Sequence, residues 1–391
     1  MDISVYLEPV AALVSDELPL GSHPRLGHSM LIYQEDTPFP ELEGIRIALI
    51  GVPDERGVVN NAGCATGADE IRRYLYKLFP GAWTSGIADL GNIRKGHSVE
   101  DTYFALSATL EWLISNKVFP VVLGGGQNLT YAMYKAYANM KQIINMAVID
   151  PVFDLGETSD ELNSNTYLSH IIVERPNYLF NFTNLGYQTY YVDQPAIDLM
   201  KKLLFDTYRL GLLHGNLSDA EPLLRNADVL SFDTGAIRAA DAPGNANAGP
   251  NGFSGDEACQ LVRYAAMSDK LSSIGFFEYN PALDRRGLTA QLLAQMVWYA
   301  FEGYNNRKDD FPDAGSDMFI KYIVPTKDFA DGIVFIKSRK TDRWWMEIVC
   351  GAESRQKYLN HYIVPCTYKD YQTACDNEVP DRWWQMYQKL M

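Results

Sequence analysis

Three carboxylates and one amide follow apolar runs of this sequence, at points where buried strands would end. Asp150 and Asp154 follow the run MAVI, Asp233 ends the run VLSF, and Gln127 follows three glycines after VVL. If these runs are neighbouring parallel strands, their carboxyl ends meet at one rim of a sheet. Like charges that close cannot all ionise unless a cation or protons intervene. A hard divalent cation with oxygen ligands would fit such a rim.

The same aspartates have a second explanation. Asp commonly caps helices and turns, because its side chain accepts hydrogen bonds from nearby backbone N–H groups. On spacing alone this capping explanation is the favoured one. The choice between the two depends on the elements that position the residues.

Apolar strands and amphipathic helices alternate along most of the chain. Fully apolar runs are typical of strands buried on both faces, and strand–loop–helix repetition predicts a parallel sheet with helices on both sides. Ligands bind outside the carboxyl ends of such strands, so we expect chemistry in the loops that follow them. The expected strands are 45–53, 87–92, 119–126, 144–149, 227–232 and 271–278, and the expected helices are 68–79, 101–117, 128–140, 255–268 and 289–303.

The two ends of the chain differ from this pattern. Residues 1–43 are mixed in character and are expected to form an irregular arm, and residues 44–305 the α/β domain. A linker is expected at 309–315, within a C-terminal, Trp-rich extension over 306–391 that packs on the main domain. Its β-branched and aromatic residues suggest antiparallel strands. The words YIVP and DRWW each occur twice there, which suggests a duplicated unit, and the Trp pairs suit either packing or an interface.

Composition excludes several classes of protein. The 391 residues are 47% hydrophobic and 21% charged, which is ordinary for a globular protein. The formal net charge of −15 makes nucleic acid an unlikely partner. Five scattered cysteines suggest a reducing cytoplasm rather than a disulfide framework. The N-terminus lacks the basic start of a signal peptide, and no apolar run reaches the roughly 18 residues of a membrane span, so we expect a cytoplasmic protein that binds no membrane.

Six blocks, in order, resemble the signatures of one enzyme family. They are IALIGVPDERGVVNNAGCATGADEIRRYL, IADLGN, VVLGGGQNLTYA, VIDPVFDL, LSFDTGAIRAADAPGNANAGPNGFSGDEA and FFEYNPALDRRGLTAQLLAQMVWYAF. They resemble the opening strand and helix, the second signature, the Gly-Gly-x-His loop, the D-A-H-x-D loop, the D-x-D signature and the closing E-x-N-P helix of the ureohydrolases. This arginase–agmatinase–formimidoylglutamase resemblance covers residues 45–303. It implies an arginase-like α/β fold, three αβα layers around a mostly parallel sheet, to which the β-rich extension is added.

The resemblance also implies a metal site. In that family two manganese ions share a hydroxide that attacks an amidine or guanidinium carbon, because metals lower the pKa of bound water. The six ligands are two His and four Asp. The positions that match and keep their ligand are Asp150, Asp154 and Asp233. The positions that match and are substituted are Gln127 and Val152, which replace the two His, and Gly235, which replaces the fourth Asp.

These substitutions change the expected cofactor. Val152 and Gly235 have no donor atom in their side chains, and the nearest downstream His is His170. We therefore expect no binuclear manganese pair. Without imidazole ligands, we expect either no cofactor or one weakly bound divalent cation (Mg, Ca or Mn) on the three aspartates and the Gln127 amide oxygen.

The positions that match the family's ligand-binding residues are better preserved than those that match its metal ligands. Glu278 matches the acid that faces the cationic amidine or guanidine in the family, since a carboxylate accepts two parallel N–H bonds. Its other explanation is an acid at a strand end that faces solvent. Asn163 and Asn165 fall where the family's substrate loop lies, and Gly126 lets the backbone approach the rim. Any surviving catalysis is assigned to Asp154 and Glu278.

Three hypotheses follow for function. The first is a ureohydrolase-fold protein that has lost binuclear hydrolysis and binds an amidine, guanidine or amino-acid-like ligand. The second is a divergent formimidoylglutamase-type hydrolase that acts on linear amidines with one divalent metal. The third is an interaction protein that works through its Trp-rich extension. The family's usual homo-oligomers also make self-association an expectation.

Overall fold

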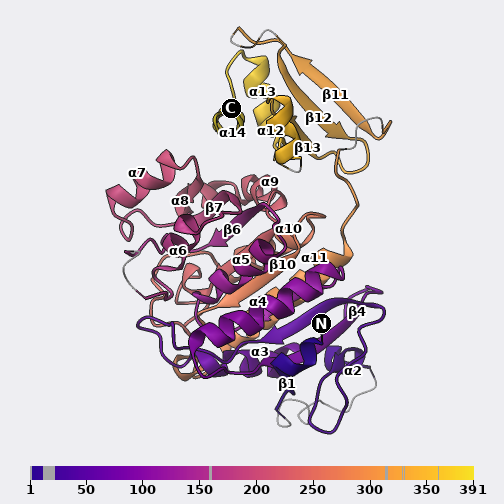
Figure 1. The fold of residues 1–391 in the computed structure, drawn as a ribbon, viewed down its shortest axis with the longest axis vertical. Helices are drawn as coiled ribbons and strands as arrows, with labels where there is room; N and C mark the ends of the chain where they lie inside the picture. The colour runs from indigo at the N-terminus through magenta and orange to yellow at the C-terminus, as the bar shows by residue number, and fades with distance from the viewer. Residues whose placement is uncertain are drawn as a thin grey trace.

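The computed structural model describes residues 2–11, 23–157, 161–312, 316–327, 329, 331–359 and 361–391. Of the predicted linker, residues 313–315 lie outside this range. The described chain forms a large α/β body and a smaller C-terminal unit (Figure 1).

A central sheet of ten strands organises the body. Its order is β1-β4-β3-β5-β10-β9-β6-β7-β8, with β2 paired to β4, and every pairing except β1 with β4 is parallel. The carboxyl ends of β5, β6, β9 and β10 therefore meet at one rim. The strands are β1 (Leu7–Glu8), β2 (Leu31–Ile32), β3 (Ile45–Gly51), β4 (Gly86–Ile93), β5 (Phe119–Leu123), β6 (Ile144–Ile149), β7 (Leu179–Tyr187), β8 (Asp206–Arg209), β9 (Val229–Asp233) and β10 (Ser273–Phe277).

Helices cover both faces of the sheet. In β3, Ile47 and Leu49 face one layer, and Ala48 and Ile50 face the other, because successive side chains of a strand point to opposite sides. The first layer contains α2 (Leu26–Ser29), α3 (Gly67–Leu75), α8 (Leu210–Gly215), α9 (Glu221–Arg225), α10 (Gly255–Ala266) and α11 (Leu288–Asn305). The second contains α4 (Val99–Ser115), α5 (Leu129–Asn139), α6 (Tyr167–Val173) and α7 (Gln194–Lys202). Among the described residues, no helix has the length and apolar character needed to span a bilayer.

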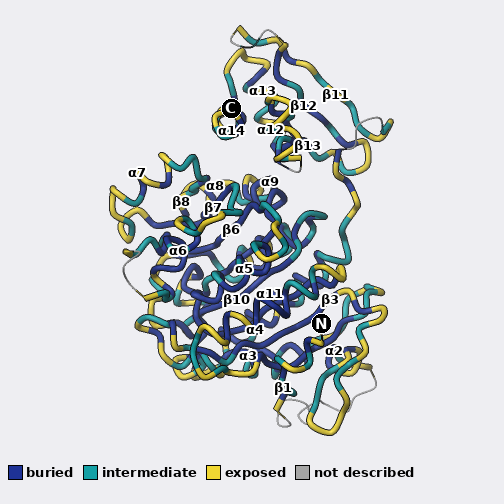
Figure 2. Tube along the Cα trace, in the orientation of Figure 1, coloured by how far each residue is buried: buried dark blue, intermediate teal, exposed yellow. Residues whose placement is uncertain are grey.

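Burial follows this layering. The trace through the central strands is almost wholly buried (Figure 2). Capping boxes begin α4 at Ser98 and α10 at Ser254, where each Ser accepts from the backbone N–H three residues on. Short 3-10 turns lie at Ile3–Tyr6, Cys64–Thr66, Leu217–Ala220, Thr234–Ala236 and Pro281–Leu283.

Two features of the body differ from the sequence-based expectations. The N-terminal arm is not wholly irregular, because β1 and β2 add to the sheet beside β4. Strands β7 and β8 were not predicted. Their sequences, LFNFTNLGY and DTYR, carry polar residues at positions that the structure buries, such as Asn181 and Asn184, so they lack a continuous apolar run.

The C-terminal unit is a four-stranded antiparallel sheet covered by helices. The strands β11 (Phe319–Val324), β12 (Ile333–Ser338), β13 (Trp344–Glu347) and β14 (Ile363–Cys366) pair in that order, and the helices are α12 (Ala352–Lys357), α13 (Tyr368–Cys375) and α14 (Asp381–Leu390). The expectation of antiparallel strands is confirmed. The DRWW words are not equivalent, because the first enters a strand and the second a helix. Trp344, Trp345 and Trp383 are buried and Trp384 is 45% exposed, so packing uses three of the four.

Candidate ligand site

A cavity of about 500 Å³ opens at the carboxyl ends of the central strands. It contains most of the residues that the sequence singled out. Three acids line it, Asp154, Asp233 and Glu278, and Asp150 lies behind them, fully buried. The other lining residues are Val59, Asn60, Gln127, Pro151, Val152, Ser164, Asn165, Gln188, Tyr191, Gly235, Asn247 and Gly249.

Asp150, in the turn after β6, has two carboxylate oxygens with different surroundings. Oδ1 of Asp150 accepts from the backbone N–H of Val152 at 2.7 Å, while Oδ2 is buried with no hydrogen-bond partner. Asn184 of β7 holds the turn by donating to the carbonyl oxygens of Asp150 and Val152. Burial raises the pKa of Asp150 to about 6. Asp150 therefore caps its turn with one oxygen and leaves the other available to a proton or cation.

Asp154 is strained as well as buried. Its backbone φ of 53° is in the left-handed region, which non-glycine residues rarely adopt. Its Oδ2 also has no hydrogen-bond partner. Burial, followed by the charges of Asp150 and Asp233, raises the pKa of Asp154 well above its usual value. Strained, under-satisfied residues of this kind gather at functional sites.

Asp233 combines a cap with a cavity position. Its Oδ1 accepts from the N–H of Gly235 at 2.7 Å and from Nδ2 of Asn245 at 3.3 Å. Burial, followed by the charges of Asp150 and Glu278, raises the pKa of Asp233 well above its usual value. The capping explanation and the shared-rim explanation thus both hold for this residue.

Glu278 follows β10 and is held from two sides. Its Oε1 accepts from the backbone N–H of Gln127 at 2.9 Å, and its Oε2 accepts from Nδ2 of Asn61 at 2.9 Å. Its φ of 63° is also left-handed. Burial raises the pKa of Glu278 to about 7, although the bonds from Asn61 and Gln127 act in the opposite direction. The side chain is 3% exposed, so it does not face bulk solvent as its second explanation required.

The side-chain amide of Gln127 is hydrogen-bonded to a neighbouring tyrosine. Its Nε2 donates to the hydroxyl of Tyr167 at 3.3 Å. Burial, followed by the charges of Asp154, Asp150 and Asp233, raises the pKa of Tyr167 well above its usual value. Tyr167 was missed by sequence reasoning, because it lies in the first turn of α6 and not after a strand.

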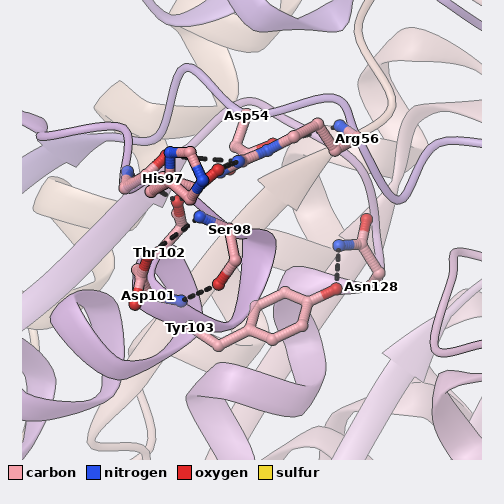
Figure 3. Close-up of polar contacts among 9 residues, drawn as sticks. Asp54, Arg56, His97, Ser98, Asp101, Thr102, Tyr103 and Asn128 are labelled. Carbon is pink, nitrogen blue, oxygen red and sulfur yellow. Dashed lines mark hydrogen bonds and ion pairs between the residues drawn. The ribbon is translucent and has the colours of Figure 1, made fainter.

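The loop after β3 forms one wall of the cavity, and contacts to the start of α4 hold this loop in place. Figure 3 shows the Arg56 guanidinium paired with Asp54 and bonded to the hydroxyl of Thr102 and the carbonyl oxygen of His97. Burial acts to raise the pKa of Asp54, but the hydrogen bonds from Arg56 outweigh it and lower that pKa. The brace connects the loop to the start of α4, so the wall that carries Val59 and Asn60 is fixed.

Two predicted residues take other places. The Asn163 side chain accepts from the N–H of Asn165 and donates to the carbonyl oxygen of Glu161, so it organises its own loop and does not line the cavity. Gly126 is also outside the lining. A Cβ there would lie 2.3 Å from Asn128 Oδ1 and 2.5 Å from a Val58 methyl carbon, so a larger residue would force these side chains to shift.

Other residues in or beside the cavity escaped the sequence reasoning. Gln188 and Tyr191 follow β7, and that strand was itself not predicted. Asn61 lies in the loop after β3, which was marked as a place for chemistry, but nothing in its spacing singled it out. Asn247 lies inside the long loop after β9, where asparagine suits turns as readily as sites.

The donor set does not fit a pair of manganese ions. Val152 and Gly235 line the cavity and bring no donor atom, and no His is among the described lining residues. Among the residues that the structure describes, no three His, Cys, Asp or Glu side chains form a metal-binding group. The two unpaired oxygens of Asp150 and Asp154 are the atoms best suited to one hard cation.

Residues 45–302 match the sequence pattern of the Arginase family. The chain belongs to this family. The chain is similar to a Streptococcus gordonii formimidoylglutamase, 28% identical over 292 residues, which cover 68% of this chain and 86% of that protein. A Bacillus subtilis formimidoylglutamase is 24% identical over 281 residues, which cover 66% of this chain and 86% of that protein.

Solved structures of the family share the fold. The crystal structure of the Bacillus subtilis formimidoylglutamase superimposes with a TM-score of 0.66 at 20% identity, over 74% of this chain and 95% of that one. A Trypanosoma cruzi formiminoglutamase with Mn²⁺ gives a TM-score of 0.66 at 18% identity, over 73% of this chain and 100% of that one. The predicted arginase-like, three-layer α/β fold with an added C-terminal β unit is confirmed.

Proposed function

We propose that this chain uses the carboxylate cavity to bind an amidine, guanidine or amino-acid-like ligand and has lost two-manganese hydrolysis. The observation that carries this proposal is the identity of the side chains beside the acids. Val152 and Gly235 line the cavity without a donor atom, while Asp154, Asp233 and Glu278 remain. The acids can attract a cation, but two transition ions would lack half of the expected ligands.

Glu278 supports the ligand-binding half of the proposal. Its carboxylate is fixed by Asn61 and Gln127, so it is pre-organised before any ligand enters. A planar cation can form paired N–H bonds with a carboxylate, and pre-organisation lowers the entropic cost of forming them.

A second candidate is a formimidoylglutamase-type hydrolase that uses one divalent cation. The unpaired oxygens of Asp150 and Asp154 favour it, together with the names of the relatives. When bound, such a cation would supply a water of lowered pKa. Asp150 and Asp154 would hold it through these oxygens.

The two candidates separate in one set of measurements on the purified full chain. Metal content is measured first, and hydrolysis of formimidoylglutamate is then assayed with and without added Mn²⁺ or Mg²⁺. We expect no turnover and no stoichiometric metal, together with guanidine binding that falls at least about tenfold in Glu278→Gln, because a charge-assisted bond pair is lost. Asn163→Ala is the matched control, since Asn163 lies outside the lining.

Metal-dependent turnover that disappears in Asp150→Asn would overturn the first candidate and support the second. Two tightly held manganese ions per chain would overturn both.

A further inference from the structure

A second cavity, of about 330 Å³, lies at the junction where the C-terminal unit meets the body. Its body wall comes largely from residues that precede or begin β6, β7 and β8, and its other wall comes from α12, the residue after it, and α14. This junction cavity is therefore at the amino ends of the strands, whereas the acids of the carboxylate cavity end or follow strands. Its volume suits a small organic molecule.

The charged residues that line the junction cavity are both lysines. Lys357 comes from α12 and Lys389 from α14, and none of the described lining residues is Asp or Glu. Their sign is opposite to that of the carboxylate cavity and to the formal net charge of −15 of the whole chain. An anion in the junction cavity would therefore meet charges that attract it.

The ammonium of Lys389 is bonded to uncharged acceptors. It donates to the carbonyl oxygen of Phe180 at 3.5 Å and to Oδ1 of Asn181. A lysine ammonium has three N–H donors. One donor of Lys389 is thus without a partner among the residues that the structure describes, and the side chain lines the cavity.

The amide of Asn181 separates Lys389 from the acid behind it. Nδ2 of Asn181 donates to Oδ2 of Asp206 at 2.7 Å, while Oδ1 of the same amide faces the ammonium. Burial lowers the pKa of Lys389 to about 8, although the charge of Asp206 acts in the opposite direction. At neutral pH Lys389 is therefore a largely charged group with no direct ionic partner in the described part of the chain.

Aromatic rings surround the two ammonium groups. The Lys389 ammonium lies 5.7 Å from the ring centre of Phe180 and 5.1 Å from that of Phe205. The Lys357 ammonium lies 4.9 Å from the ring centre of Tyr358, and the Tyr358 and Phe180 rings are 5.0 Å apart. Flat apolar surface beside two cations matches a ligand whose negative group is attached to a ring.

We propose that the junction cavity is a second ligand site, which takes a small aromatic carboxylate and is completed by the C-terminal unit. The carboxylate accepts from the unpartnered N–H of Lys389 and is attracted by Lys357, and the ring packs among Phe180, Phe205 and Tyr358. Because the lysines belong to the unit and the two phenylalanines to the body, the ligand also stabilises the docking of one on the other. This site does not depend on the function proposed for the carboxylate cavity.

Calorimetric titration of the full chain at pH 7 with three probes tests the proposal. Phenylacetate carries a ring and a charge, phenylacetamide carries the ring alone, and acetate carries the charge alone. We expect one phenylacetate to bind per chain, at least about tenfold more tightly than either of the other probes. The reason is that the site rewards both a charge-assisted bond and the burial of a ring.

Lysine variants locate the binding. Lys389→Gln should weaken phenylacetate binding at least about tenfold, because the charged donor is lost. Lys357→Gln should also weaken it, and since Lys357 is exposed, this variant tests the site even if Lys389→Gln disturbs the junction. Lys369→Gln removes an exposed lysine of α13 that does not line the cavity, so this matched control should leave the affinity unchanged.

Equal affinities for phenylacetate and phenylacetamide would overturn the proposal, because the cavity would then not respond to charge. Phenylacetate binding that neither Lys389→Gln nor Lys357→Gln weakens would place the ligand elsewhere and also overturn it. The absence of any phenylacetate binding would do the same. Each of these outcomes leaves the function proposed for the carboxylate cavity standing.

Discussion

Asp150 and Asp233 each serve both as a turn cap and as an acid of the shared rim. Each caps a turn through Oδ1, which accepts from a backbone N–H two residues on, and each turns toward the shared acidic rim. The cap fixes the rotation of the carboxylate, so the turn itself aims the other oxygen. At these positions the local role and the site role support each other.

Restoring the three substituted ligand positions should restore metal affinity. We expect Gln127→His, Val152→His and Gly235→Asp together to raise Mn²⁺ affinity at least about tenfold, because imidazole and carboxylate donors return. A Cβ at position 235 would lie 3.2 Å from Asn245 Nδ2, so that side chain must shift by a few tenths of an ångström. Calorimetric Mn²⁺ titration measures the effect.

Asn163→His is the control for this variant, because it adds an imidazole outside the cavity. An unchanged Mn²⁺ affinity in the folded triple variant would show that the residue-by-residue match to the family is wrong.

Asn61 should matter for stability as well as for binding. Asn61→Ala removes the donor to Oε2 and to the backbone carbonyl oxygen of Glu278, both buried, and we expect a loss of about 1–3 kcal/mol in the free energy of unfolding. Asn163→Ala removes the same chemical group from an exposed loop and should cost less than about 1 kcal/mol. Urea unfolding of both variants checks the difference, and equal costs would contradict the role given to Asn61.

Among the elements, most of the strands that the sequence predicted have continuous apolar runs, and the exception is β4, predicted from IADLGN. β3, β5, β6, β9 and β10 are of this kind, and the acids of the cavity end or follow three of them, β6, β9 and β10. Their order in the sheet is not readable from the runs themselves, yet parallel strands with alternating helices were enough to place the acids at one rim. β7 was missed because the buried amides of Asn181 and Asn184 interrupt its apolar pattern, and β8 because its four residues, DTYR, form no apolar run. The wall that follows β7 was missed with that strand.

The hydrogen-bond partners of the site residues were less predictable from the sequence than the positions of those residues. The sequence marked Glu278 by family resemblance, but its clamp by Asn61 depends on a contact across 217 positions of the chain. The left-handed backbone of Asp154 and Glu278 has no sequence signal of the kind that glycine gives. These details follow from tertiary packing and not from local pattern.

The junction between the C-terminal unit and the body contains a buried histidine. Nε2 of His361 donates to the carbonyl oxygen of Ile143 at 3.2 Å, its Nδ1 is buried with no partner, and its ring packs 4.7 Å from that of Phe180. Burial, followed by the charges of Lys270 and Lys389, lowers the pKa of His361 to about 2.

Acidification should therefore weaken the fold at this junction. The imidazole stays neutral when folded, whereas the unfolded chain takes up a proton below about pH 6.5, so the stabilisation is complete above that pH and declines as pH falls. We expect His361 to account for about 2 kcal/mol of the stability lost between pH 7 and pH 5. Urea unfolding at both pH values checks this, and His361→Gln should lose less over the same interval. An identical pH dependence in the variant would contradict the neutral, buried histidine.

Across the whole molecule, the C-terminal unit and the cavity occupy opposite ends of the sheet. The unit contacts residues that precede or begin strands: Gln385 donates to the carbonyl oxygen of Leu204 before β8, and Arg225 before β9 donates to that of Trp344. The cavity lies where strands end. The unit therefore covers the amino ends of β6, β7, β8 and β9 and does not wall the ligand site.

Removal of residues 316–391 should lower the thermal stability of the chain and leave its guanidine affinity nearly unchanged. We expect a lower melting temperature, because the contacts that partly bury Phe180 and Leu204 are lost. Guanidine affinity should stay within about twofold in the fraction that folds, since distant, independent sites couple weakly. Trp384→Ala, at a 45% exposed position, is the control for a mild surface change. An unchanged melting temperature would show that the unit does not brace the body, and lost binding in folded material would show that it shapes the cavity.

The separation of these two ends has a consequence for stoichiometry. A partner or second copy that covered the C-terminal unit would leave the mouth beside Glu278 open, so both encounters could be simultaneous. The number of ligand molecules bound per chain would then be the same before and after association. Ligand binding would depend on the concentration of ligand, and association on the concentration of the partner.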